Sequence, residues 1–580
     1  MNDSVQTALE FIQVSKQFTT SKRPVNALQG ISLRVSEGAV VALVGPDGAG
    51  KTTLMRLAAG LLLPNSGAIQ VFGFDTDQQA ESIHAMIGYM PQRFGLYEDL
   101  SVAENLNLYS DLHNVSQIER QQRFSELMEM TGLAPFTKRL AGRLSGGMKQ
   151  KLGLACTLLS QPRILLLDEP SVGVDPVSRR ELWKIIDHQV KNNGMTVLLS
   201  TAYLDEAERC TDVVLMDNGE ILDQNSPEFF KNKMQGRCFL VNHANYSNRN
   251  LQKLLSEQQG IIDAIIQGEK VRIITDNADP SNLVFFKNNT SKLNIATTEP
   301  RLEDAFIALL RKRHPPTMIP EIKSIKNTDA EIVKEVIRVE GVDRWFGNFQ
   351  AVKKLNFTVN RGEIFGLLGA NGAGKTTTFR MLCGLLPVSN GQLSVAGVDL
   401  RKAAARARAK IGYMSQKFSL YGNLSVMQNL EFFSSAYGLK QQQRQQRIQW
   451  ALEQFQLKSA QNSDSGDLPL GYKQRLAMAC ALMHEPEILF LDEPTSGVDP
   501  LARREFWNRT NLLAASGVTV LVTTHFMEEA EYCDRLVIMV EGQILIAGTP
   551  TEIKQQVTSP SLPEPTMEDA FIKLVEARQI

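Results

Sequence analysis

Cysteine is scarce in this sequence, and nothing arranges it as a scaffold. Only six of the 580 residues are cysteine, and none forms a Cys-x-x-Cys pair. This usage excludes a zinc ribbon and argues against a disulfide framework. Cys156 and Cys480, like Cys210 and Cys533, occupy matching positions of a repeat. We therefore predict that these four side chains are small buried apolar residues.

Long apolar runs and a strong net charge are also lacking. No run approaches the roughly 18 to 20 apolar residues that cross a bilayer, and residues 1–10 lack the layout of a signal peptide, so we expect a protein of the cytoplasm. The formal net charge of −1 gives no general attraction to nucleic acid or anionic lipid. A chain of 580 residues is too long for one hydrophobic core, which predicts several domains.

A glycine-rich motif occurs twice, as GPDGAGKT at residues 45–52 and as GANGAGKT at residues 369–376. Each copy follows a short apolar run, at 40–44 and 364–368, which predicts a buried strand. The motif is typical of a loop whose backbone N–H groups face phosphates, whose lysine reaches the terminal phosphates and whose threonine binds Mg²⁺. The predicted nucleotide-binding residues are Gly45, Pro46, Asp47, Gly48, Ala49, Gly50, Lys51, Thr52 and Thr53 in the first loop, and Gly369, Ala370, Asn371, Gly372, Ala373, Gly374, Lys375, Thr376 and Thr377 in the second.

The two loops belong to a longer internal repeat. Three pairs of residues keep one offset of 324 positions, namely Lys51 and Lys375, Gln92 and Gln416, and Asp168 and Asp492. A constant register over such a distance indicates a duplicated domain.

An apolar run that ends in Asp-Glu-Pro occurs in each copy. It predicts a buried strand that delivers two carboxylates to the carboxyl end of a sheet, where ligands bind in α/β folds. Asp168 and Asp492 would hold Mg²⁺, and Glu169 and Glu493 would polarise the water that attacks the γ-phosphate. An acidic pair that caps the next turn is the alternative.

The order of motifs resembles that of ABC-type ATPases over nearly all of both copies. The phosphate loop is followed by Tyr-Met-x-Gln with Gln92 or Gln416, by Leu-Ser-Gly-Gly at residues 144–147 in the first copy, and by Thr-Thr-His with His525 in the second. The resemblance implies an α/β protein that binds ATP and Mg²⁺ and hydrolyses ATP. It implies two tandem P-loop ABC ATPase domains, each a RecA-like core plus a helical subdomain. The residues between the two copies predict, in addition, a small αβ accessory subdomain after the first.

The resemblance also assigns roles to individual residues. Phe18 and Phe346 lie where the family stacks an aromatic ring on adenine, although either could be a core residue. The predicted catalytic residues are Glu493, His525 and Glu169. The Leu-Ser-Gly-Gly motif, which we call the signature, is predicted to contact the γ-phosphate through Ser145, Gly146 and Gly147. The predicted metal-binding residues are Thr52, Gln92, Asp168, Thr376, Gln416 and Asp492.

The two copies differ where this chemistry is expected. Pro469 and Leu470 stand where the first copy has the serine and glycine of the signature, and proline offers neither an N–H nor a hydroxyl. Ala202 stands where the second copy has its histidine. The resemblance implies that two copies pair head to tail, and we expect them to pair within one chain because the departures are complementary only across unlike halves. Both losses then fall in the site built on Lys51. We therefore predict a fast hydrolytic site on Lys375 and an impaired site on Lys51, with neutral drift as the alternative.

The segments between and after the copies complete the expected organisation. The accessory segment predicts strands at 238–241 and 271–275 and a helix at 251–258, and its role is either packing or regulation. The expected boundaries are 5–235 for the first ABC ATPase domain, 236–310 for the accessory αβ subdomain, 311–332 for a linker, 333–555 for the second ABC ATPase domain and 556–580 for a C-terminal helical tail.

Both copies end in Glu-Asp-Ala-Phe, at 303–306 and 568–571, and carry Leu-Tyr after the glutamine, at 96–97 and 420–421. These two short motifs resemble those of the ATPase subunits of type-two ABC exporters. The resemblance implies multidrug efflux, two integral-membrane permease subunits on separate chains, no nucleic acid, and a peripheral position on the cytoplasmic side of the bacterial inner membrane. Exposed Leu and Tyr side chains would dock the membrane partner, but a helix-on-helix core explains the same pattern.

Two other functions remain open at this point. Tandem ATPases of sugar importers also have unequal halves. Soluble ABC translation factors that act on ribosomes join two copies as well, but they typically keep both signature words and a charged helical arm between them.

Overall fold

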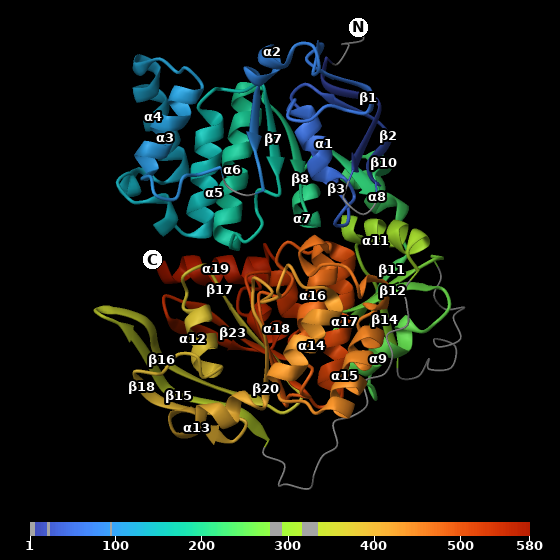
Figure 1. Ribbon diagram of the computed structural model, residues 1–580, viewed down its shortest axis with the longest axis vertical. Coiled ribbons are helices and arrows are strands. Elements are labelled where there is room, and N and C mark those ends of the chain that lie inside the picture. The colour runs from blue at the N-terminus through green and yellow to red at the C-terminus, as the bar shows by residue number, and fades with distance from the viewer. Residues whose placement is uncertain (1–5, 20–23, 93–94, 279–292, 316–333, 580) are drawn as a thin grey trace. The chain divides into compact units, whose positions relative to one another are not determined.

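The computed structural model describes residues 6–19, 24–92, 95–278, 293–315 and 334–579 (Figure 1). The chain divides into two compact units. One consists of Met1–Gln235 and Glu299–Arg313, and the other consists of Gly236–Thr298 and His314–Ile580. Residues 316–332 of the expected linker lie outside the described residues.

The first unit contains an antiparallel sheet and a mostly parallel one. The antiparallel sheet has the order β2 (Pro24–Ser36), β1 (Thr7–Thr19), β4 (Ser66–Val71), β5 (Phe74–Asp75). The other sheet has the order β10 (Glu220–Asn225), β9 (Asp212–Asp217), β3 (Val40–Val44), β8 (Thr196–Ser200), β7 (Ile164–Asp168), β6 (Ile87–Met90), with β10 antiparallel to β9. The helices of this unit are α1 (Lys51–Ala58), α2 (Ala80–His84), α3 (Val102–Leu112), α4 (Gln117–Thr131), α5 (Gly146–Leu158), α6 (Pro176–Asn193), α7 (Leu204–Ala207), α8 (Pro227–Lys233) and α11 (Leu302–Arg313).

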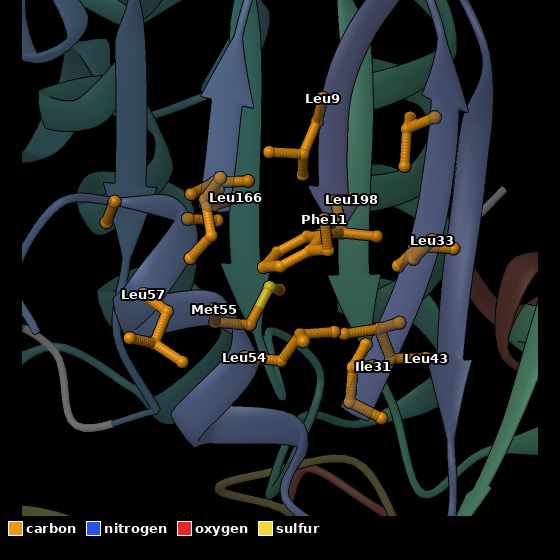
Figure 2. Close-up of a cluster of buried hydrophobic side chains, with 14 of the residues drawn as sticks. Leu9, Phe11, Ile31, Leu33, Leu43, Leu54, Met55, Leu57, Leu166 and Leu198 are labelled. Carbon is orange, nitrogen blue, oxygen red and sulfur yellow. The ribbon is translucent and has the colours of Figure 1, made fainter. Parts of the chain in front are cut away.

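The helix that follows the phosphate loop is held between these two sheets. Leu54 and Met55 of α1 are fully buried. They pack between Phe11 of the antiparallel sheet and Leu166 and Leu198 of β7 and β8 (Figure 2). Because α1 buries apolar side chains toward both sheets, the loop at its start has a fixed position relative to the strand ends.

The second unit repeats this arrangement and adds an accessory subdomain. Its antiparallel sheet has the order β16 (Phe349–Asn360), β15 (Glu335–Phe346), β18 (Asn390–Val395), β19 (Val398–Asp399). Its mostly parallel sheet has the order β20 (Ile411–Met414), β21 (Ile488–Asp492), β22 (Thr519–Thr524), β17 (Ile364–Gly369), β23 (Arg535–Val540), β24 (Gln543–Gly548). The helical elements are α12 (Lys375–Leu382), α13 (Leu400–Arg408), α14 (Val426–Ala436), α15 (Gln441–Gln454), α16 (Leu470–Ala481), α17 (Pro500–Ala515), η6 (Met527–Tyr532), α18 (Pro550–Gln555) and α19 (Met567–Gln579).

The accessory subdomain is one helix on an antiparallel sheet. The strand order is β12 (Ile261–Gln267), β13 (Lys270–Thr275), β11 (Cys238–His243), β14 (Leu293–Thr297), and the helix is α9 (Asn248–Ser256). The strands expected at 238–241 and 271–275 are present, whereas β12 and β14 were not predicted. The helix begins earlier than expected because Ser247 caps it by accepting a hydrogen bond from the backbone N–H of Asn250.

The accessory subdomain packs against the second ATPase domain, although it follows the first in sequence. Asp263 forms a buried ion pair with Arg504 of α17, and Gln252 of α9 donates to Asn508 at 2.8 Å. Arg249 donates to the carbonyl oxygen of Gly362 at 3.1 Å. Long-range contacts of this kind cannot be inferred from chain order.

Helix α11 belongs instead to the first unit, so the structural division differs from the boundary expected at 310. The backbone N–H of Leu302 donates to Glu208 at 2.7 Å, and Arg313 pairs with Glu220 at 3.0 Å. The corresponding tail helix of the second unit, α19, packs on η6 and α18.

Two absences from the sequence have structural counterparts. All six cysteines are buried and unbridged, as predicted for four of them. In the part of the chain that the structure describes, no helix is both long enough and apolar enough to span a membrane.

Candidate nucleotide sites

Each phosphate loop ends in a glycine that no other residue could replace without strain. Gly50 and Gly374 cap α1 and α12 in the left-handed conformation, with φ of 100° and 95°. A Cβ atom on Gly50 would lie 2.6 Å from the carbonyl oxygen of Ala27. The bare backbone therefore turns the first N–H groups of the helix toward the loop, which is the geometry that binds phosphate.

The loop lysines are buried and fold back onto their own loops. Lys51 Nζ donates to the carbonyl oxygen of Gly45 at 2.7 Å, and Lys375 Nζ donates to that of Gly369 at 2.6 Å. Both ammonium groups thus lie within the curve of the loop, where they can transfer their hydrogen bonds to phosphate oxygens.

The aspartates that end β7 and β21 face the start of the loop helices. Asp168 Oδ1 accepts hydrogen bonds from Thr52 at 3.1 Å and from Ser200 at 2.7 Å. Asp168 Oδ2 is buried and has no hydrogen-bond partner among the described residues. Asp492 Oδ1 accepts from Thr523 at 2.6 Å, and burial raises the pKa of Asp492. A buried carboxylate oxygen beside a threonine hydroxyl fits the oxygen ligands of Mg²⁺.

The glutamate after each aspartate has an unusual backbone conformation. The φ angles of Glu169 and Glu493 are 53° and 46°, in the left-handed region that residues other than glycine rarely adopt. The backbone N–H of Glu169 is held by the Ser200 hydroxyl at 3.0 Å, and that of Glu493 by the Thr523 hydroxyl at 3.1 Å. This turn directs both side chains away from the direction of the preceding strands. Backbone strain of this kind is concentrated at functional sites.

Three groups surround the carboxylate of Glu493. Gln416 donates to it at 2.6 Å, His525 Nδ1 lies 3.2 Å away, and Lys375 is near enough to act on its charge. Burial alone would raise the pKa of Glu493, but His525, Lys375 and Gln416 outweigh burial and lower it. Glu493 therefore stays ionised, as a group that polarises water must.

The carboxylate of Glu169 has a different environment. It accepts a hydrogen bond from the backbone N–H of Ala202 at 3.1 Å and lies 3.9 Å from Lys51. Burial raises the pKa of Glu169 to about 7, and Lys51 offsets only part of this rise. Gln92 is exposed. The structure thus brings the glutamine and histidine of the second copy to its glutamate, whereas Ala202 presents only a backbone N–H to Glu169.

The signature helices also begin differently. Ser145 caps α5 by accepting a hydrogen bond from the N–H of Met148 at 3.3 Å, and Gly146 and Gly147 form the first turn. Pro469 occupies the cap of α16 without a side-chain hydrogen bond. The first turn of α16 therefore lacks the polar cap of α5.

The two aromatic residues expected at adenine lie at the ends of long strands. Phe18 is half-buried, with Lys16 Nζ 5.4 Å from its ring centre. Phe346 is exposed, with the Arg344 guanidinium 4.6 Å from its ring centre. Exposure leaves the Phe346 ring accessible for stacking.

Two buried glutamates near the sites were not predicted, Glu206 and Glu529. The available signal was an acidic residue repeated in both copies shortly after the Ala202 and His525 positions. Nothing in the sequence alone distinguished these residues from exposed helix residues.

Comparison with known proteins identifies the class of protein. The family described as "ABC transporter" matches residues 28–172 and 352–496. The chain belongs to this family as an ATP-binding subunit with two ATPase domains, which confirms the expected fold class and ATPase activity.

Individual relatives match either the whole chain or about two fifths of it. The chain is 51% identical over 579 residues, covering 99% of this chain and 98% of the relative, to the "Probable multidrug ABC transporter ATP-binding protein YbhF" of Escherichia coli (strain K12). It is 37% identical over 219 residues, covering 38% of this chain and 70% of the relative, to the "Linearmycin resistance ATP-binding protein LnrL" of Bacillus subtilis (strain 168). A solved "Structure of ATP binding subunit of ABC transporter" is 29% identical with a TM-score of 0.38, over 41% of this chain and 99% of that one.

Proposed function

We propose that this chain drives export of drug-like compounds, as a peripheral subunit on the cytoplasmic side of the bacterial inner membrane, with two permease subunits on separate chains. The names of its multidrug and linearmycin-resistance relatives support export rather than import. ATP binding and hydrolysis would move the permeases between inward and outward access, with both copies acting together in one polypeptide.

An exposed aromatic surface on the second unit supports a membrane partner. Tyr421 is 49% exposed, and its ring centre lies 4.6 Å from that of Phe432, which is also exposed. The side-chain amide of Asn429 holds the backbone of Tyr421 in place. Its oxygen accepts a hydrogen bond from the Tyr421 N–H at 3.0 Å, and its nitrogen donates to the Tyr421 carbonyl at 3.2 Å. A fixed, exposed pair of aromatic rings suits an apolar helix end of a permease.

The first unit builds the same feature around Tyr97, which is 58% exposed. Asn105 holds its backbone N–H at 3.0 Å and its carbonyl at 3.1 Å. Both copies thus present a tyrosine from the same kind of turn, as two permease subunits would require.

Mg²⁺ and ATP fit the described residues. Thr52 with Asp168, and Thr376 with Asp492, would hold the ion, which neutralises developing charge on the phosphates during transfer. Among the described residues no group of three His, Cys, Asp or Glu side chains could hold a metal by itself. This agrees with a magnesium ion held jointly by one carboxylate, a hydroxyl, water and phosphate oxygens.

We propose that the two sites hydrolyse ATP at different rates. This proposal depends on the contrast between the two glutamates. Glu493 is kept ionised beside His525 and Gln416, whereas burial raises the pKa of Glu169 to about 7. A glutamate that is partly protonated at neutral pH is a poor group for orienting water. The second unit would therefore supply most of the turnover.

Paired substitutions test the unequal sites. Glu493→Gln should lower steady-state ATPase activity of the purified chain about a hundredfold or more, within the range of a lost general base, and Glu169→Gln should lower it less than about tenfold. Binding of a fluorescent ATP analogue to both variants is the control for folding. Equal losses would contradict the proposal.

The membrane partner is tested by copurification. A tagged Glu493→Gln chain, stalled with ATP bound, should recover two polytopic membrane proteins in near-equal amounts from detergent-solubilised cells. The same chain with Tyr421→Asp added should bind ATP but lose them. Recovery of ribosomes without membrane protein would show a soluble factor instead.

A further inference from the structure

A buried glutamate follows the histidine position in each half. Glu529 lies on η6 and Glu206 on α7, and both residues are only 1% exposed. Neither belongs to the phosphate loop, the Asp-Glu turn or the signature. Because a buried carboxylate is costly unless its oxygens accept hydrogen bonds, its partners indicate what it holds together.

Glu206 joins three segments of the first unit. Its carboxylate accepts hydrogen bonds from the hydroxyl groups of Ser171 and Thr201, both at 2.8 Å, and from the indole N–H of Trp183 at 3.2 Å. Ser171 directly follows the Asp-Glu-Pro word, and Thr201 directly precedes Ala202. The carboxylate therefore connects the turn of the glutamate to the loop after β8.

Glu529 makes the matching connection in the second unit. Its carboxylate accepts from the hydroxyl of Thr495 and from the indole N–H of Trp507, the latter at 3.3 Å. Thr495 lies two residues after Glu493. Trp507 is fully buried in α17 and stacks on Tyr532 with ring centres 4.7 Å apart, so it is a rigid donor.

The loop that carries the histidine lies beside the same carboxylate. Burial raises the pKa of Glu529, and the nearby charge of Arg503 and the hydroxyl of Thr524 lower it in part. Thr524 Oγ1 also accepts from the N–H of Phe526 at 2.9 Å. The residues on both sides of His525 are thus linked to each other, and Thr524 lies beside Glu529.

We propose that Glu529 is a positioning residue for His525. Its carboxylate ties the turn after Glu493 to the loop that carries His525, and so holds His525 Nδ1 at 3.2 Å from Glu493 Oε2. Hydrogen bonds to a ligating or reacting group fix its orientation in this way at many sites. The proposal rests on the proposed role of His525 in the faster site. Glu206 makes the same connection in the half where Ala202 replaces the histidine, so it supports the local fold alone.

The chain itself offers a matched control. Glu529→Leu replaces the carboxylate with an apolar side chain that has no acceptors, Glu529→Gln keeps one carbonyl acceptor, and Glu206→Leu makes the identical change in the half that lacks the histidine. We expect Glu529→Leu to lower kcat for ATP about 10- to 100-fold with KM within about threefold, because misplacement by about 1 Å has effects of this size. Glu529→Gln should recover most of kcat, and Glu206→Leu should lower kcat less than about threefold.

A double variant separates positioning from a general structural role. If Glu529 acts through His525, the combination His525→Ala with Glu529→Leu should be no slower than His525→Ala alone. Additive losses, or an equal loss in Glu206→Leu, would overturn the proposal. If Glu529→Leu fails to fold, Thr495→Val removes one donor while keeping shape, and an unchanged kcat in that variant would also overturn it.

The outcomes also distinguish the positioning role of Glu529 from the proposed role of His525, on which it depends. A His525→Ala chain with normal kcat would refute the role of His525 itself. A His525→Ala chain that loses activity, beside a Glu529→Leu chain that does not, would refute only the positioning role of Glu529.

Discussion

Glu169 and Glu493 occupy the same strained turn in two copies of one fold, and their pKa values move in opposite directions. Burial dominates at Glu169 and raises its pKa to about 7, while His525, Lys375 and Gln416 overcome burial at Glu493. The backbone is the same in both, with hydrogen bonds from Ser200 or Thr523 to the glutamate N–H. The comparison shows that the charge of a buried carboxylate depends on neighbours supplied by other segments of the chain.

The largest expected effect on ATPase turnover comes from removing the histidine at position 525 or introducing one at position 202. His525→Ala should lower ATPase kcat about a hundredfold, equivalent to about 3 kcal/mol of barrier, because the group that keeps Glu493 charged is lost. Ala202→His should raise the residual activity of a Glu493→Gln chain. Turnover of both variants, measured against wild type at saturating Mg-ATP, checks this. No gain from Ala202→His would show that other differences limit the first site.

The accessory subdomain is a second difference between the halves, since it packs against the second ATPase domain. Asp263→Ala leaves the buried charge of Arg504 uncompensated and should destabilise the second unit by about 3 kcal/mol. Calorimetry should show one unfolding transition shifted downward and the other unchanged. The exposed pair Arg338 and Glu340 provides a control, since Glu340→Ala should shift neither transition.

The opposite pKa shifts predict opposite effects on stability without nucleotide. The raised pKa of Glu169 gives stability that is present below its ordinary value of 4.5 and lost as pH rises to about 7, so Glu169→Gln should stabilise the first unit at pH 7.5 by about 2 kcal/mol. The lowered pKa of Glu493 gives stability that is present above 4.5 and lost only as pH falls through the folded-state pKa. Glu493→Gln should therefore destabilise the second unit at pH 7.5.

Unfolding temperatures at pH 5 and pH 7.5 test this contrast. The stabilisation by Glu169→Gln should shrink at pH 5, where the native carboxyl is already protonated. Shifts of the same sign in both variants would contradict the assigned environments.

The smallest expected effect concerns the signature. Pro469→Ser together with Leu470→Gly restores the polar cap and the open first turn of α16, and should raise ATPase activity only a few-fold, since a cap is worth about 1 kcal/mol. Ser145→Ala, the reverse change at α5, should lower activity. A Pro469→Ser, Leu470→Gly chain with unchanged turnover would indicate that this departure is neutral.

Much of each site could be predicted from local sequence. The loops before Lys51 and Lys375, and the buried strands that end at Asp168 and Asp492, are short segments whose glycines and apolar runs determine their own conformation. The accessory strands β12 and β14 escaped prediction, since short strands depend on the neighbours with which they pair.

The sequence by itself therefore determined the fold class, the duplication and the candidate phosphate loops, because each follows from a local pattern repeated in register. Only the tertiary structure decided that the accessory subdomain joins the second ATPase domain, through Asp263 and Arg504, which lie 241 positions apart. It also decided that the buried Glu529 accepts hydrogen bonds from Thr495 and Trp507, and that Glu493 keeps its charge. These features depend on side chains brought together from distant segments, where burial and neighbouring charge, rather than local propensity, set the energy.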